Sequence, residues 1–233
     1  ANLKIAARRI VWGKCLNAGQ TCVAPDYLLV HEEVKSQLLE YMKGEITTFY
    51  GPHPCKNRDF PKIINQKHFE RLISLMDNSK IFTGGDYDED TLKISPTILD
   101  KVSWDDPVMQ EEIFGPIMPV LDFDDISQVI QAVNRRPKPL ALYLFTTSKQ
   151  TEKTVVESIS FGGGCINDTI VHLATSYMPF GGVGESGMGG YHGSWSFDTF
   201  SHKKSILKKS NFIDIKLRYP PYENKINLLK KVL

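Results

Sequence analysis

The spacing of apolar residues along the chain alternates between values typical of helices and of strands. Apolar residues three or four positions apart predict helices over residues 3–17, 32–50, 61–76, 124–134 and 148–159. Short apolar runs predict strands over residues 27–31, 81–83, 116–123, 140–146 and 164–167, with a hairpin-like stretch at 92–102. Because strands that alternate with helices are joined by crossover connections, we expect an α/β fold with a mostly parallel, open sheet and flanking helices.

The regular spacing ends near residue 179. Residues 179–193 are rich in glycine and predict irregular structure, and lysines recur from residue 203 onward. Within this basic stretch, residues 205–207 predict a short strand. We therefore expect an α/β domain over residues 1–200, followed by a separate strand and tail over residues 201–233.

Composition and charge exclude several classes of protein. Hydrophobic residues make up 41% of the 233 residues and charged residues 24%, which is typical of a folded domain and not of a disordered or fibrous chain. The formal net charge of +1 gives no basic surface for nucleic acid. No apolar run is long enough for a membrane span, and we expect no secretory signal. The chain begins at Ala1, directly in a helical pattern, which indicates a processed product or a piece of a longer protein.

The four cysteines, at positions 15, 22, 55 and 165, are too few and too irregularly spaced for a disulfide framework. Reduced thiols of this kind are typical of a cytoplasmic protein. Cys15 and Cys22 are too far apart in sequence for a zinc knuckle, and the six histidines show no metal-ligand spacing. We therefore expect no bound metal.

Cys22 is the first candidate for chemistry. It follows Gly19 at the expected end of a helix, and glycine permits a backbone conformation that leaves a peptide N–H free to face a developing oxyanion. Open backbone dipoles also favour the thiolate, which is the nucleophilic form of cysteine. A small buried cysteine at a junction between helix and strand would give the same pattern, so both interpretations stay open.

Glu112 is the second candidate, because it precedes Phe114 and a Gly-Pro turn just before the strand expected at 116–123. A carboxylate at the edge of a strand can hold the ribose hydroxyls of a ligand. The alternative is a solvated acidic pair, Glu111 and Glu112, in front of a core phenylalanine.

Residues 182–187 match the G-x-G-x-x-G fingerprint of dinucleotide-binding folds by pattern. That fingerprint requires a strand before it and a helix after it. Here Pro179 precedes the motif, and Met188 with two further glycines follows it. We interpret the segment as a tightly turned loop and not as a phosphate site.

Three motifs in this order resemble the catalytic half of the aldehyde dehydrogenases. They are Gly-Gln-Thr-Cys at 19–22, Glu-Ile-Phe-Gly-Pro at 112–116 and Pro-Phe-Gly-Gly at 179–182. The sequences at 22–27, 187–193, 196–202 and 217–221 are most similar to the class 3 branch of that family, and the resemblance covers residues 1–221. One departure is Cys15, where the family's cysteine signature usually has an aromatic or aliphatic residue.

The resemblance implies a role for each matched residue. Cys22 is the implied nucleophile, with its own N–H as an oxyanion donor, Glu112 binds the nicotinamide ribose of NAD or NADP, and Phe114 packs against the cofactor. Positions that line the class 3 aldehyde tunnel are matched by Trp12, Thr21, Ile170, Leu173, Phe180 and His192. Residues 203–209 match the intersubunit strand of a homodimer, so residues 201–233 are implied to be an oligomerisation strand and tail.

In the family, the dinucleotide domain, an oxyanion-hole asparagine and the glutamate that activates the deacylating water all lie N-terminal to the matched region. The resemblance therefore implies a catalytic domain without its cofactor domain, inactive by itself. The implied reaction oxidises an aldehyde to a carboxylic acid through a thiohemiacetal and a thioester on Cys22, with hydride transfer to the nicotinamide.

Two other classes of protein remain open. One is a cysteine hydrolase or acyltransferase, in which Cys22 is hydrogen-bonded to a histidine such as His192 and no nicotinamide is needed. The other is a non-catalytic dimerising fragment, which keeps the fold and the dimer surface without binding the cofactor.

Overall fold

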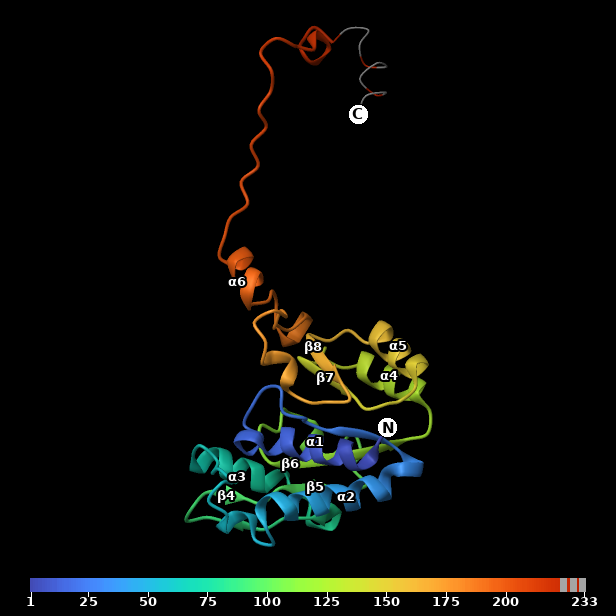
Figure 1. The fold of residues 1–233 in the computed structure, drawn as a ribbon, viewed down its shortest axis with the longest axis vertical. Helices are drawn as coiled ribbons and strands as arrows, with labels where there is room; N and C mark the ends of the chain where they lie inside the picture. Colours follow the sequence, from blue (N-terminus) through green and yellow to red (C-terminus); the bar gives the residue numbers. More distant parts are fainter. Residues whose placement is uncertain (223–225, 227–229, 231–233) are drawn as a thin grey trace. The chain divides into compact units, whose positions relative to one another are not determined.

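The computed structural model describes residues 1–222, 226 and 230, and the chain divides into two units, Ala1–Thr199 and Phe200–Leu233 (Figure 1). The first unit contains all the strands and both hydrophobic cores. The mixture of a mostly parallel sheet and flanking helices confirms the α/β fold class. The roles expected for the two units stay predictions.

The main sheet has four strands in the order β1, β6, β5, β2. Strand β6 (Ile117–Phe123) pairs in parallel with β1 (Leu28–His31) and with β5 (Thr97–Leu99), whereas β2 (Ile81–Thr83) pairs antiparallel with β5. The first five residues of β6 are buried, as expected of a central parallel strand.

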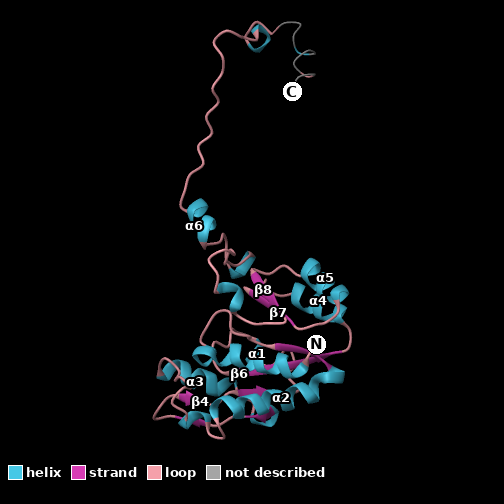
Figure 2. Cartoon of the chain, in the orientation of Figure 1, coloured by secondary structure: helices cyan, strands magenta, loops and turns pink. Residues whose placement is uncertain are grey.

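Three helices accompany this sheet: α1 (Leu3–Cys15), α2 (Glu32–Tyr50) and α3 (Gln66–Leu75) (Figure 2). Helices α1 and α2 pack against each other. Helix α1 begins where Asn2 Oδ1 accepts a hydrogen bond from the Ile5 amide at 3.2 Å, which satisfies one unpaired donor of the first turn. Helix α2 ends at Gly51, whose positive φ of 75° is accessible to glycine.

A second, two-stranded parallel sheet joins β7 (Ala141–Leu144) to β8 (Gly163–Ile166). Helices α4 (Ile126–Asn134) and α5 (Lys149–Ser158) contribute the buried valines of a separate small core. Ser148, the first residue of the helix predicted over 148–159, caps α5, with its Oγ accepting from the Thr151 amide at 3.2 Å. The helix predicted from residue 124 begins later, because Asp125 caps α4 by accepting from the Ser127 amide at 2.9 Å.

Two further expectations need correction. Helix α3 begins at Gln66 and not near residue 61, because Asn65 caps it and the Ile64 amide donates to Gln20 Oε1 at 2.9 Å. The hairpin expected at 92–102 does not pair with itself. Strand β4 (Lys93–Ile94) pairs with β3 (Tyr87–Asp88), while β5 joins the main sheet.

The remaining segments of regular structure are short. Residues 193–199 form helix α6 (Gly193–Thr199), which the sequence did not predict. The 3-10 helices are η1 (Leu16–Gly19), η2 (Pro54–Lys56), η3 (Asn78–Lys80), η4 (Pro107–Met109), η5 (Val171–Leu173), η6 (Gly184–Ser186) and η7 (Lys216–Arg218). Among the described residues, no helix has both the length and the apolar character needed to cross a bilayer.

The second unit contains the predicted intersubunit segment. Residues 203–209 form no strand in the single chain, and Ile206 and Leu207 are exposed. Because a strand needs a neighbouring strand for its backbone hydrogen bonds, the intersubunit assignment of this segment stays a prediction.

One close backbone contact ties η1 to the start of β6. Gly19 has a φ of 73°, and a Cβ atom at this position would lie only 2.2 Å from the Gly115 carbonyl oxygen. A side chain is therefore excluded both by the left-handed conformation and by lack of space.

Replacing Gly19 with alanine is therefore expected to destabilise the chain by roughly 2–4 kcal/mol, from backbone strain together with overpacking. The matched control is Gly44→Ala in α2, where an added Cβ meets nothing within 4 Å. The control should stabilise by roughly 0.5–1 kcal/mol, because alanine is the better helix former. Urea unfolding measures both changes. Equal stability of the two variants would contradict the proposed contact.

Candidate active site around Cys22

Cys22 occupies the middle of a tight turn. The Ala24 amide donates to the Thr21 carbonyl at 2.9 Å, which closes the turn over Cys22 and Val23. The preceding residues Asn17 and Ala18 have left-handed backbone conformations, with φ of 53° and 52°. Cys22 itself is exposed. In the described part of the chain its backbone N–H has no hydrogen-bond partner, so this N–H is available to an oxyanion.

The other three cysteines have different surroundings. Cys15, the last residue of α1, is buried, and burial raises the pKa of its thiol to about 12. Cys165 is partly buried, and burial likewise raises its pKa. Cys55 is also partly buried, with its Sγ 3.3 Å from Ser95 Oγ. Exposure therefore distinguishes Cys22 from the other three.

The loop that carries Glu112 lies against the Cys22 turn. Asp26 Oδ1 accepts a hydrogen bond from the Ile113 amide at 3.0 Å, and Gly19 packs on Gly115. From α3, Arg71 donates to the carbonyls of Glu112 and Ile113 at 3.3 and 2.5 Å. These bonds bring together two motifs that are about 90 residues apart in the sequence.

Glu112 and Phe114 both face outward from this loop. Phe114 is 40% exposed and has a φ of 49°, an uncommon conformation for a bulky residue. It is therefore not the core residue of the alternative interpretation. Partial burial raises the pKa of Glu112, and the negative charge of Asp26 raises it further. Arg71 and Lys14 oppose this shift with their positive charges.

Lys14 is a fully buried cation close to both loops. Its side chain is 0% exposed, and within the described residues its Nζ has no hydrogen-bond partner. Burial lowers the pKa of its ammonium group to about 8, although Asp26, Cys15 and Glu112 act in the opposite direction. An unpaired buried charge is costly, so Lys14 should be a source of instability near neutral pH.

Two of the predicted tunnel residues are close together. The rings of Phe180 and His192 are 6.3 Å apart, and an isolated antiparallel bridge joins Phe180 to Tyr191. His172 extends this cluster, with its ring 6.0 Å from that of Phe180. His192 Nδ1 lies 3.2 Å from the Met178 carbonyl.

Of the other predicted tunnel residues, one belongs to α1 and another packs against this helix. Trp12 is 41% exposed on α1, whereas Ile170 is buried. The Ile170 Cδ1 atom lies 3.5 Å from the position a Cβ would take at Gly13. Thr21 and Leu173 are both partly buried. Within the described part of the chain, no ring contact or hydrogen bond joins these four residues to Phe180. A tunnel shared by all six residues therefore stays a prediction.

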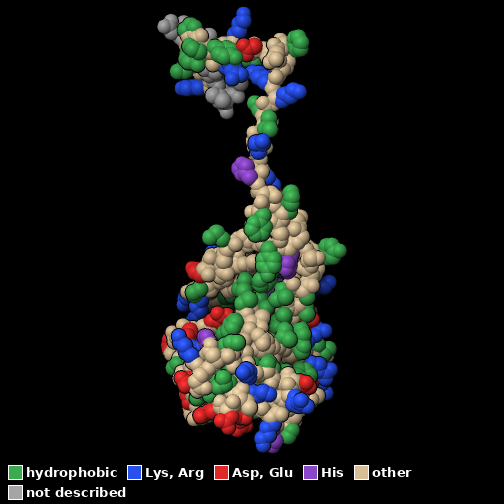
Figure 3. Space-filling view, turned by 90° about the vertical axis from the view of Figure 1, so that its left-hand side faces the viewer, with side chains coloured by type: hydrophobic (Ala, Val, Ile, Leu, Met, Phe, Trp, Pro, Cys, Tyr) green, Lys and Arg blue, Asp and Glu red, His purple; other side chains and the backbone are tan. Residues whose placement is uncertain are grey.

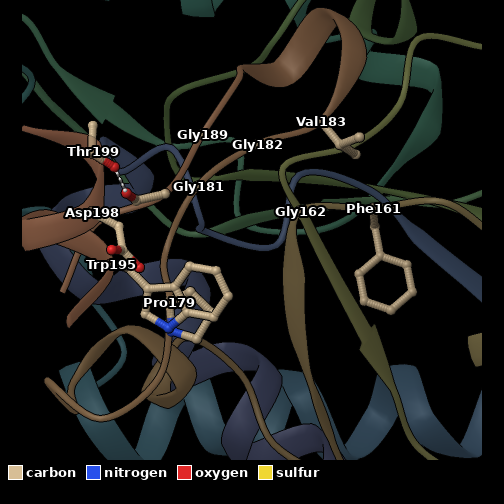
Figure 4. Close-up of a pocket in the computed structure, with 11 residues that line it drawn as sticks. Phe161, Gly162, Pro179, Gly181, Gly182, Val183, Gly189, Trp195, Asp198 and Thr199 are labelled. Atoms are coloured by element: carbon tan, nitrogen blue, oxygen red, sulfur yellow. Dashed lines mark hydrogen bonds between the residues drawn. The ribbon is translucent and has the colours of Figure 1, made fainter. Parts of the chain in front are cut away.

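The glycine-rich loop borders a cavity of about 420 Å³ (Figure 4). Trp195 and Pro179 lie together on one side of it, and Phe161 lies on the other. A Cβ at Gly182 would lie 2.1 Å from the Ser186 carbonyl oxygen, so the glycine is needed for the loop's own turn. The short η6 lies within the motif, and the next helix, α6, begins only at Gly193, so no helix starts at these glycines as a dinucleotide fingerprint requires. Neither Cys22 nor Glu112 lines this cavity.

Exposed apolar side chains follow β8, among them Tyr177, Met188 and Phe197. Figure 3 shows hydrophobic side chains gathered on one face of the first unit. Apolar surface of this kind commonly marks a contact with another protein segment.

The site contains several residues that the sequence did not single out: Lys14, Arg71, Tyr143 and His172. Lys14 had a readable signal, because it follows Ala7, Ile10 and Val11 at the spacing of the buried face of α1. Arg71 had none, since its partners, two backbone carbonyls and the Glu111 carboxylate at 3.3 Å, all lie in a distant loop.

Comparison with known proteins agrees with the resemblance found in the sequence. Residues 1–206 match the model of the aldehyde dehydrogenase family. Aldehyde dehydrogenase family 3 member H1 of Arabidopsis thaliana is 47% identical over 238 residues, covering 100% of this chain and 49% of that protein. The dimeric NADP-preferring aldehyde dehydrogenase of Rattus norvegicus is 48% identical over 222 residues, covering 94% of this chain and 49% of that protein.

A solved structure gives the same result. A substrate-bound state of Staphylococcus aureus AldH superimposes with a TM-score of 0.92 at 48% identity, covering 100% of this chain and 51% of that one. The chain therefore belongs to the aldehyde dehydrogenase family, with class 3 proteins among its relatives. It spans about half the length of these relatives.

Lys14 generates a prediction about pH. The unfolded chain protonates Lys14 below its ordinary pKa of 10.5, but the folded chain does so only below about 8. Between these values the unfolded state binds more protons, so the free energy of unfolding should increase with pH, and below pH 8 the full cost is present. Relative to Lys14→Met, the wild-type chain should gain about 3 kcal/mol from pH 8 to 10.5.

Urea unfolding of both proteins across this pH range measures the difference. Lys67→Met, at an exposed position of α3, is the matched control and should give a flat difference curve. A curve for Lys14→Met that is equally flat would show that Lys14 titrates normally.

Proposed function

We propose that this chain is the catalytic part of an NAD(P)-dependent aldehyde dehydrogenase that oxidises aldehydes to carboxylic acids, with Cys22 as the nucleophile. The observation that carries the proposal is the position of an exposed Cys22, with an unpaired backbone N–H, in a turn packed on the Glu112 loop. Family membership supplies the reaction class.

The chemistry follows from these groups. The Cys22 thiolate forms a bond to the aldehyde carbon, and the carbonyl electron pair moves to oxygen, giving a thiohemiacetal oxyanion. The free N–H of Cys22 donates to this oxyanion. When the oxyanion collapses, hydride leaves the carbon and a thioester remains on Cys22. Water then attacks the thioester, releasing the carboxylic acid and restoring the thiol.

Glu112 and Phe114 fit the nicotinamide end of the cofactor. A partly solvated carboxylate beside an exposed aromatic ring can accept hydrogen bonds from ribose hydroxyls while the ring packs on an apolar face. Glu112 and Phe114 would hold NAD or NADP there, and the nicotinamide would supply the acceptor for the hydride that leaves the thiohemiacetal carbon. Arg71 holds the loop backbone, so that the Glu112 side chain stays free for the ligand.

We assign the aldehyde to a tunnel that includes Trp12, Thr21, Ile170, Leu173, Phe180 and His192. The ring cluster of Phe180 and His192 supports an apolar wall. The six residues are predominantly apolar and aromatic, which suits hydrophobic aldehydes.

We also propose a homodimer in the cytoplasm. The relative from Rattus norvegicus is named as dimeric, and exposed Ile206 and Leu207 in a basic segment suit a strand that pairs with a second copy. The four free cysteines suit a reducing compartment.

A cysteine hydrolase has less support. Among the described residues no histidine is hydrogen-bonded to Cys22, and the His192 ring nitrogen Nδ1 faces the Met178 carbonyl. Such an enzyme needs a base in contact with its nucleophile. A fragment that only dimerises has no need of a reactive Cys22. The reactivity of this thiol therefore distinguishes such a fragment from the proposed enzyme.

Limited alkylation with iodoacetamide at pH 7, followed by peptide mapping, tests the proposal. Cys22 should react first, because the other three thiols are buried or partly buried. Cys22→Ser should remove the fast phase, and the control Cys55→Ser should leave it unchanged. In an enzyme that joins this chain to a cofactor domain, Cys22→Ser should abolish turnover. Faster labelling of Cys55 or Cys165 than of Cys22 would refute the proposal.

A second prediction concerns the cofactor. Glu112 and Phe114 contact only the nicotinamide end, so this 233-residue chain should bind NAD with a Kd weaker than about 1 mM, since each lost 1.4 kcal/mol of contacts is tenfold in affinity. Isothermal calorimetry measures this directly. Low-micromolar binding would mean that this chain carries phosphate and adenosine contacts of its own.

A further inference from the structure

The turn that carries Cys22 is fixed at one peptide group. The peptide between Val23 and Ala24 donates its N–H to the Thr21 carbonyl at 2.9 Å. Val23 is fully buried, whereas Cys22 beside it is exposed. The orientation of this peptide therefore sets where Cys22 points.

Tyr143 binds the other side of the same peptide. Its hydroxyl donates to the Val23 carbonyl at 2.7 Å, although the two residues are 120 positions apart. Both polar groups of the Val23–Ala24 peptide are thus hydrogen-bonded within the described chain, while the Cys22 N–H is left free. This length is typical of a hydrogen bond between a hydroxyl donor and a carbonyl oxygen.

Tyr143 is itself held in place on both sides. It lies in β7 opposite Cys165 of β8, in the parallel register of the small sheet. Its ring packs edge-on against the buried ring of His172 at 5.8 Å, and His172 Nδ1 lies 3.6 Å from Cys165 Sγ. Gly163 makes room for His172, since a Cβ there would lie 3.1 Å from the ring.

The hydroxyl of Tyr143 remains a donor at every physiological pH. Burial raises the pKa of this phenol well above its usual value, although a backbone hydrogen bond with Ile170 acts in the opposite direction. A protonated phenol cannot act as a base, but it can donate a steady hydrogen bond. Its role is therefore one of geometry and not of proton transfer.

We propose that Tyr143 is a positioning residue for the nucleophile: by holding the Val23 carbonyl, it keeps the Cys22 thiol and its free N–H presented together on the exposed side of the turn. The inference rests on the proposed function of Cys22. It also connects the turn to the predicted tunnel, because His172, which packs on Tyr143, contacts Phe180 as well.

Tyr143→Phe removes only the hydroxyl and tests this role. In the 233-residue chain, iodoacetamide alkylation of Cys22 at pH 7 should slow about threefold or more, because the thiol is no longer held on the exposed side of the turn. Amide exchange of Ala24 should quicken about fivefold, the effect of one lost hydrogen bond. Tyr41→Phe is the matched control, because among the described residues its hydroxyl accepts a hydrogen bond only from Gln37, which also lies in α2.

The outcomes separate the two claims. If wild-type Cys22 is not the fastest thiol, the proposed function fails before Tyr143 is considered. If wild-type Cys22 is fastest but Tyr143→Phe leaves its alkylation rate unchanged, only the positioning role is overturned. Loss of thermal stability without a change at Cys22 would likewise leave Tyr143 a purely structural residue.

A second variant decides the question if Tyr143→Phe does not fold. Placing 3-fluorotyrosine at position 143 keeps the ring and makes its hydroxyl a stronger donor. Amide exchange of Ala24 should then slow, and alkylation of Cys22 should be at least as fast as in the wild type. Unchanged exchange at Ala24 would overturn the proposal.

Discussion

The contact of Gly19 with the Gly115 carbonyl is the constraint on which the site depends. It brings the turn after α1 against the loop before β6 at a distance that only glycine allows. The Asp26 carboxylate then fixes the loop through the Ile113 amide, and Arg71 fixes it from the other side. The exposed thiol of Cys22 and the exposed carboxylate of Glu112 come from separate parts of the chain. They are thus carried by a turn and a loop that are packed against each other.

The buried charge of Lys14 beside this turn and loop costs folding free energy. Lys14 is buried without a hydrogen-bond partner beside two carboxylates, Asp26 and Glu112. Its charge lowers the pKa of Glu112 while burial and Asp26 raise it. Sites that bind and react commonly sacrifice stability in this way. A hydrophobic residue at position 14 would favour folding but would remove one of the two cations, Lys14 and Arg71, that lower the pKa of Glu112.

The sequence predicted most of the fold, because apolar spacing is strong in long elements such as α2 and β6. It failed where pairing depends on distant partners. The stretch at 92–102 reads as a hairpin, yet β4 and β5 pair with different strands. Residues 61–65 read as helical, but Gln20 holds the Ile64 amide in a non-helical position. Single hydrogen bonds of this kind do not affect the spacing of apolar residues, so the sequence pattern does not reveal them.

The site was less accessible to sequence reasoning. Spacing alone left Cys22 and Glu112 as separate candidates, and the family resemblance joined them. Tyr143 lies in an apolar strand and shows its importance only through one hydroxyl, which needs a partner when buried.

The central claim is that this chain, by itself, brings the Cys22 turn and the Glu112 loop together. A nitroxide spin label attached to the exposed Cys22 tests this most directly, through paramagnetic broadening of backbone amide signals in the 233-residue chain. The account predicts strong broadening of the Glu112, Ile113 and Phe114 amides. Unbroadened signals from residues 112–114 would contradict it.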